Sequence, residues 1–175
     1  EARARKFVPD PATGSPVSGA DPWMLDATDF TLCVPDDSAG CLQLMVNPKV
    51  LDAQTHLAAD RYLAYHGELN SARLVLWEID SAKGAGQMFQ GVDMAIPNPL
   101  ASRENSLLKQ LNVSQSSLSA AAQRVLEKVW ADPRAVGIDP WGIDVNSRFG
   151  ITRICFSEPV TESTARGAID ELLAG

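Results

Sequence analysis

Three polar side chains within residues 48–67 have the types and spacing that metal binding or proton transfer requires. Asp52, His56 and Asp60 recur at every fourth position, so a helix would place a carboxylate, an imidazole and a carboxylate along one face. Such a stripe can hold a metal ion or position a general base. A solvated polar face is the alternative interpretation, because the other side of the same helix would be apolar.

A second group, Tyr65, His66 and Glu68, falls where this helix would end at Gly67. The helix dipole alone favours an imidazole at that position, without any catalytic role. Helix ends and loops often border clefts, so His66 is the best candidate for a general base, with Tyr65 or Glu68 beside it. This group predicts a small enzyme as one of three alternative functions.

Residues 107–126, LLKQLNVSQSSLSAAAQRVL, have the pattern of two helices joined by a tight turn. The second helix carries one apolar stripe that begins at Leu118, and Val113 and Leu118 occupy the positions of a hydrophobic staple. Over about twenty residues the segment resembles the helix-turn-helix of bacterial repressors. The resemblance implies that segment 102–130 reads DNA with Gln115, Ser116 and Arg124. It departs from that pattern at Leu108, where those families have a smaller residue.

The distribution of charge argues against nucleic acid as a partner. The chain has a net charge of -7, which repels phosphate. Residues 8–40 hold six acidic and no basic side chains, whereas residues 101–130 hold four basic and two acidic ones. This basic excess is too small for the phosphate neutralisation on which DNA affinity depends. We therefore expect the two helices to be a packing unit.

The tripeptide Asp-Pro-Trp occurs twice, ending at Trp23 and at Trp141. Asp-Pro starts turns, and a tryptophan after such a turn either caps the core or docks onto another protein. Residues 1–24 are rich in proline and glycine and lack apolar periodicity, which predicts a flexible N-terminal arm. Trp23, at the end of this arm, is the better candidate for binding, and Trp141 is the second.

The three cysteines lack the spacing of a metal site, and no cofactor motif is present, so we expect no cofactor. Cys33 and Cys41 flank a turn and could face each other across a hairpin, which would leave Cys155 free. Three buried thiols are the alternative. Because the sequence starts with Glu1, an exported or processed form is plausible, but the compartment is left open.

The order of predicted elements indicates an α+β fold. Strand-like segments come in adjacent pairs, giving the order β-β-α-β-β-α-α-β-β-α, so we expect an antiparallel sheet with helices mainly on one face. The length suits one domain, residues 25–175, after the arm. No apolar run approaches the roughly 20 residues of a membrane span, which predicts a soluble protein.

The absence of a catalytic signature favours a noncatalytic binding or assembly module. Its partner would be another protein or a small apolar ligand. A nucleic-acid-binding regulator and the small enzyme described above are the alternatives. The oligomeric state is left open.

Overall fold

The computed structural model describes residues 7–34, 40–69, 71–113, 115–126, 132–148 and 150–174. Every strand pair in these ranges is antiparallel, and helices accompany the strands, so the fold class is α+β as predicted. The chain divides into two compact units, residues 1–97 and residues 98–175. We had expected one domain, but each unit has a buried apolar cluster of its own.

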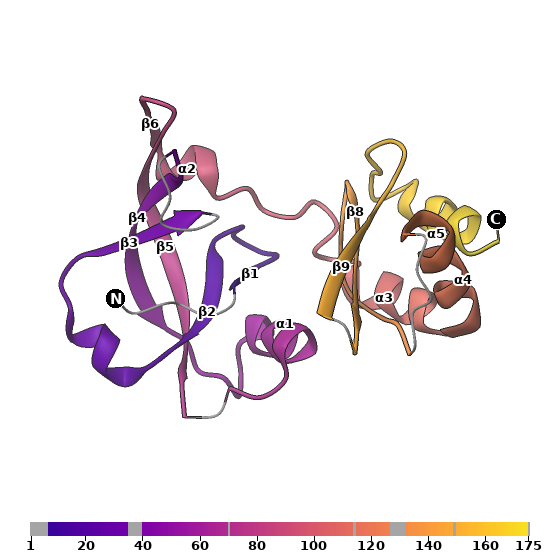
Figure 1. The fold of residues 1–175 in the computed structure, drawn as a ribbon, viewed down its shortest axis with the longest axis horizontal. Helices are drawn as coiled ribbons and strands as arrows, with labels where there is room; N and C mark the ends of the chain where they lie inside the picture. The colour runs from indigo at the N-terminus through magenta and orange to yellow at the C-terminus, as the bar shows by residue number, and fades with distance from the viewer. Residues whose placement is uncertain are drawn as a thin grey trace. The chain divides into compact units, whose positions relative to one another are not determined.

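The first unit contains a six-stranded antiparallel sheet with the order β1-β2-β5-β4-β3, and β6 also pairs with β5. Figure 1 shows how these strands curl around one another. The long strand β5 is central to the sheet. Its first residues, 73–76, pair with β2, and its last residues, 81–84, pair with β6. The strands are β1 (Phe7–Pro9), β2 (Pro16–Ala20), β3 (Phe30–Val34), β4 (Leu42–Val50), β5 (Arg73–Gly84) and β6 (Gln87–Gln90).

The two faces of this sheet bury different sets of side chains. On one face helix α1 (Leu57–His66) packs so closely that a Cβ on Gly19 would lie 3.0 Å from the Tyr62 hydroxyl. On the other face Trp77 is fully buried, and its indole Nε1 donates a hydrogen bond of 2.9 Å to Ser18 Oγ. The Phe30 ring lies 5.3 Å from that indole, centroid to centroid. The interior of this unit is therefore filled by aromatic and aliphatic side chains.

The predicted N-terminal arm, residues 1–24, differs from the structure over residues 7–24. Strands β1 and β2 lie in the sheet, and Val8 and Val17 are fully buried. Between them, the Gly14 amide donates to the Asp10 carbonyl over 2.7 Å. The sequence pattern did not reveal these strands, because each is short and is bounded by a proline, Pro9 at the end of β1 and Pro16 at the start of β2. Residues 1–6, the basic start of the expected arm, lie outside the described residues.

The middle of the first unit also differs from the predicted elements. Strand β4 runs to Val50 because it pairs with β5 up to that residue, so α1 begins only at Leu57. Strand β6 ends at Gln90 and gives way to the short helix α2 (Gly91–Met94). Gly91 permits this change of direction, since a Cβ there would lie 1.8 Å from the Ile79 carbonyl oxygen.

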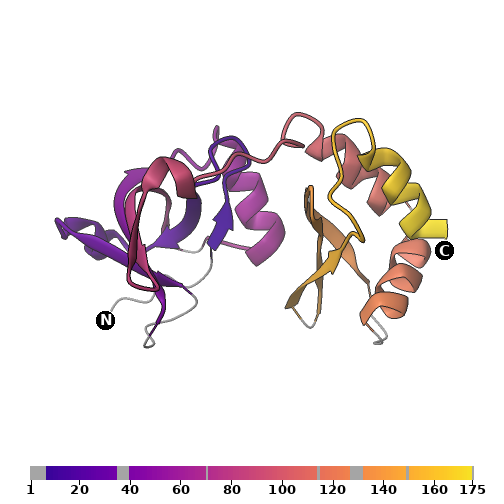
Figure 2. The same ribbon diagram turned by 90° about the horizontal axis from the view of Figure 1, so that it is seen from above.

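The second unit is a three-stranded sheet with the order β7-β8-β9, covered by helices on one face. Figure 2 shows α3, α4 and α5 together on that face. Its buried cluster includes Leu111, Leu118, Ile138, Ile154 and Ile169. The elements are α3 (Glu104–Asn112), α4 (Gln115–Leu126), β7 (Arg134–Asp139), β8 (Gly142–Ser147), β9 (Gly150–Cys155) and α5 (Ala165–Ala174). No helix of the described residues has the length and apolar character to cross a membrane.

Candidate functional site

The two Asp-Pro-Trp tripeptides place one exposed indole on each unit. Trp23 is 63% exposed and Trp141 is 64% exposed, whereas Trp77 is fully buried. Large exposed aromatic side chains are costly to hydrate and are common at the centre of protein interfaces. These two residues are therefore the candidate binding positions of the described chain.

The first tripeptide opens the short 3-10 helix η1 (Pro22–Asp26). Pro22 suits the first helical position, and the Asp21 side chain makes no capping hydrogen bond. In a 3-10 helix, side chains three positions apart eclipse each other, so Trp23 and Asp26 lie on one face. Leu25 packs against the buried cluster of the first unit and fixes the helix to the sheet.

The surroundings of Trp23 are acidic. Asp21, Asp26 and Asp29 are all exposed, and residues 8–40 contain no Lys or Arg. In the strand register, the nearest cation is Arg73, opposite Ala20. An exposed indole with three exposed carboxylates within six positions of it in the sequence attracts positive charge.

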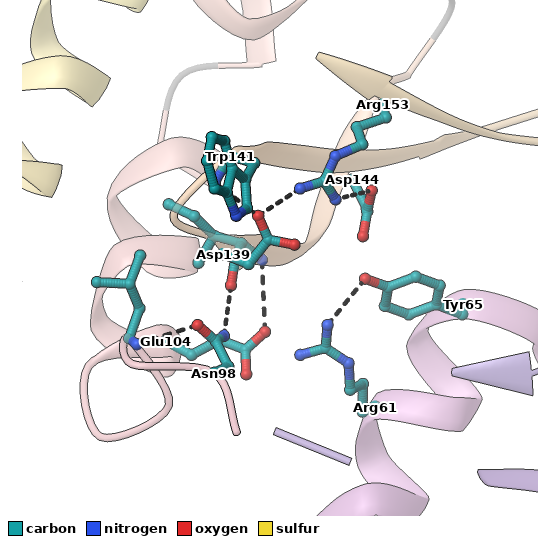
Figure 3. Close-up of polar contacts among 10 residues, drawn as sticks. Arg61, Tyr65, Asn98, Glu104, Asp139, Trp141, Asp144 and Arg153 are labelled. Atoms are coloured by element: carbon teal, nitrogen blue, oxygen red, sulfur yellow. Dashed lines mark hydrogen bonds and ion pairs between the residues drawn. The ribbon is translucent and has the colours of Figure 1, made fainter. Parts of the chain in front are cut away.

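The second tripeptide is held by an arginine. The Trp141 amide donates a hydrogen bond of 2.8 Å to Asp139 Oδ1, and Arg153 Nη2 bonds to the same oxygen. Arg153 Nη1 also lies 3.0 Å from Oδ1 of Asp144, which is on the neighbouring strand β8. Figure 3 shows the Arg153 guanidinium between the two carboxylates. One of the two carboxylate charges beside Trp141 is thus offset by Arg153.

The electrostatic balance at Arg153 favours its charged form. Burial alone lowers the pKa of Arg153, but the hydrogen bonds and charges of Asp139 and Asp144 outweigh burial, so the pKa lies above its ordinary value. The three side chains are 17% to 35% exposed, so the cluster is partly screened by water. These contacts stabilise the turn between β7 and β8.

Polar side chains also fix the free edge of β7, a feature that the sequence pattern did not reveal. The Asn112 side chain pairs with both backbone groups of Ala135, at 2.9 Å each. Asn98 Nδ2 donates to the Ile138 carbonyl over 2.7 Å, and the Ile138 amide lies 3.4 Å from Glu104 Oε1 (Figure 3). These contacts satisfy an edge that would otherwise expose unpaired backbone groups.

The helix pair of residues 102–130 has its predicted recognition residues on α4. Gln115 and Ser116 are exposed, but Arg124 Nη2 donates to the Leu172 carbonyl over 2.6 Å, close to the end of α5. Leu118 is fully buried, whereas Val113 is 85% exposed and does not form the expected staple. Ser114 and residues 127–130 lie outside the described residues.

Asp52, His56 and Asp60 do not share a helix face, because Asp52 precedes α1. Asp52 Oδ1 accepts from the Gln54 amide over 2.9 Å, and His56 Nδ1 accepts from the Ala58 amide over 3.2 Å. His56 is thus the N-cap of α1, a role that the sequence pattern did not suggest. Within the described ranges, no group of three or more His, Cys, Asp or Glu is placed to hold a metal ion.

The predicted catalytic group lies at the end of α1, but its members point to different contacts. Tyr65 is buried, and its hydroxyl accepts from Arg61 Nη2 over 3.2 Å (Figure 3). The half-buried His66 ring contacts the ring of Tyr62, 5.0 Å between centroids. Glu68 is exposed. These contacts suit a packed helix end.

The three cysteines are free thiols in the structure. Cys33 is half-buried, Cys41 is buried and Cys155 is exposed. Cys33 lies opposite Gln43 in the β3–β4 ladder, so Cys41, two residues before Gln43, lies diagonally across from Cys33. Diagonal neighbours of this kind are further apart than a disulfide allows.

Comparison with known proteins identifies similar folds. The structure is similar to the protein Atu2129 of Agrobacterium tumefaciens, of unknown function, with a TM-score of 0.66 and 21% identity over 94% of this chain and 80% of that chain. A heme binding protein from Mycobacterium smegmatis has a TM-score of 0.40 and 17% identity, covering 91% of this chain and 80% of that chain. The similarity to the first protein supports the fold alone. No family model and no curated protein matches the sequence.

Proposed function

We propose that the chain is a noncatalytic protein-binding module that uses Trp23 and Trp141 as its anchors. The observation that carries the proposal is the equal exposure of the two indoles, 63% and 64%, on elements that are fixed to a core. Each indole follows an Asp-Pro turn, so little conformational freedom of the backbone is lost on binding. Tryptophan is among the residues that contribute most to protein interfaces.

A protein suits these surfaces better than a small apolar ligand. The interior of the first unit is filled around Trp77. In the second unit, an open hollow of 440 Å³ is lined by polar side chains, among them Arg103 and Glu162. Sites for small apolar ligands are mostly apolar and enclosed. Exposed indoles on elements that are fixed to a core fit a protein partner instead.

The two alternative functions gain little support. Arg124, the basic residue of the predicted DNA-reading helix, bonds to the carbonyl of Leu172. Gln115 and Ser116 then lack a phosphate-binding neighbour on α4. The ring of His66, the predicted general base, packs edge-on against Tyr62 and at a tilt against Tyr65.

Affinity capture with matched baits tests the proposal. The wild-type chain, the double variant Trp23→Ala/Trp141→Ala and the control Val92→Ala/Val113→Ala are compared by quantitative mass spectrometry. The control removes apolar side chains that are 81% and 85% exposed, one on each unit. We expect the tryptophan variant to lose specific proteins that the wild-type chain and the control variant both capture. Direct binding of each purified candidate to the wild-type chain is then measured. Equal recovery by all three baits would contradict the proposal.

A further inference from the structure

We propose that the surface formed by Trp23, Asp21, Asp26 and Asp29, called here the Trp23 surface, binds a basic segment of a partner protein. The inference rests on the proposed protein-binding function and names the chemistry of the partner. It assigns to this surface an extended segment that carries lysine or arginine.

The geometry of η1 places a cation-binding ring beside negative charge. Trp23 is 63% exposed, and the 3-10 repeat puts Asp26 on the same face. Asp21 precedes η1 and makes no capping bond to it. A lysine or arginine over the indole face gains a cation–π interaction, and tryptophan is the best aromatic partner for it.

The charges that face this surface leave it negative. Residues 8–40 contribute no Lys or Arg. Arg73 lies opposite Ala20 in the β2–β5 ladder, and Lys49 on β4 lies 3.8 Å from Glu78. Among the described residues, three exposed carboxylates therefore stand against one arginine on the neighbouring strand. Such a field speeds the encounter with a basic segment and repels nucleic acid.

The Trp141 surface provides an internal control. Its indole is equally exposed and ends the same tripeptide, but Arg153 forms ion pairs with both Asp139 and Asp144 and offsets one of their two negative charges. A partner that merely needed an exposed tryptophan would use both surfaces. A basic partner selects the Trp23 surface.

Fluorescence anisotropy of the full chain with a short labelled peptide, in which lysine and alanine alternate, tests the inference. We expect binding at low salt that weakens about tenfold in Trp23→Ala, as for a central interface tryptophan. Trp141→Ala should bind like the wild-type chain. The triple variant Asp21→Asn/Asp26→Asn/Asp29→Asn should bind weakly and lose most of the salt dependence. A peptide with glutamate in place of lysine should not bind, and thermal unfolding of each variant checks that it is folded.

Two results would overturn the inference. One is the absence of binding to the wild-type chain. The other is equal weakening by Trp23→Ala and Trp141→Ala, or by neither, since binding would then be diffuse attraction to an acidic chain. If the peptide fails but the double tryptophan variant still loses captured proteins, the chemistry of the partner is wrong and the protein-binding function stands. If the peptide binds at Trp23 and capture is unchanged, the protein-binding function is wrong instead.

Discussion

The same tripeptide, Asp-Pro-Trp, is used in two ways within one chain. At residues 21–23 the turn is closed by the backbone, with the Met24 amide donating to the Asp21 carbonyl over 3.0 Å. At residues 139–141 the aspartate side chain closes it and also binds Arg153. Both indoles are exposed to the same degree. The neighbours of the tripeptide, rather than its own residues, thus decide whether its aspartate is engaged or left facing solvent.

This difference follows from the elements that carry each turn. Helix η1 lies between two strands that do not pair with each other. The β2–β5 ladder ends at Ala20 and Arg73, so among the described residues no ladder partner faces Asp21. The second turn joins paired strands, and β9 brings Arg153 directly opposite Asp144. Cross-strand pairs of opposite charge are a usual way to stabilise such a sheet.

The largest expected effect comes from loosening the strand that holds the second turn. Asn112→Ala leaves the amide and carbonyl of Ala135 without their side-chain partner, at a cost of about 2 to 3 kcal/mol for buried backbone groups. Hydrogen exchange should accelerate at Ala135 and Ile138 but not in β4 or β5. Lys109→Ala, an exposed change on the same helix, is the control. Unchanged exchange in the Asn112 variant would mean that the edge of β7 is held by other contacts.

A smaller effect is expected from converting the second turn into a copy of the first. Arg153→Met keeps the aliphatic stem and leaves Asp139 and Asp144 unneutralised, which costs about 1 to 2 kcal/mol for a partly exposed cluster. The variant should also gain a second site for the lysine peptide, and Trp141→Ala should remove that site. Arg134→Met, at the exposed start of β7, should do neither. If Arg153→Met is destabilised but does not bind the lysine peptide at Trp141, ion pairing by Arg153 is not what distinguishes the two turns.

A change of about twofold is expected in ion quenching of tryptophan fluorescence. Caesium and iodide are compared on the wild-type chain, Trp23→Phe and Trp141→Phe. Trp23 should be quenched better by caesium than by iodide, because carboxylates surround it, while Trp141 should show no such preference. Neutral acrylamide should quench both alike, since the two exposures match. A caesium preference for both indoles would reflect the net charge of the chain alone.

Much of the fold was predictable because apolar periodicity is a local property. The stripe that includes Leu118 predicted α4, and the alternation in residues 42–46 predicted the start of β4. Strands β1, β2 and β7 were missed. They are short or bounded by prolines and glycines, and their burial depends on partners far along the chain. Pairing of that kind leaves no local period in the sequence.

The candidate sites show the same division. The tripeptides and the acidic run were visible in the sequence, and so was the interest of Trp23. The engagement of Asp139 was not, because Arg153 reaches it from another strand. The predicted stripe of Asp52, His56 and Asp60 depended on a helix that starts before residue 52. Its residues 48–50 instead complete a strand, since β5 offers them backbone partners.

The smallest expected effect is none, and it concerns pH. The folded pKa of Arg153 is raised, so its stabilisation is complete below the ordinary arginine pKa and is lost only as pH rises through the higher folded value. Between about pH 6 and about pH 9 the Arg153 guanidinium therefore keeps its charge. The difference in unfolding free energy between the wild-type chain and Arg153→Met should therefore be constant over that range, measured by urea denaturation. A difference that grows or shrinks with pH would show that another titrating group, rather than the pair of aspartates, is the partner of Arg153.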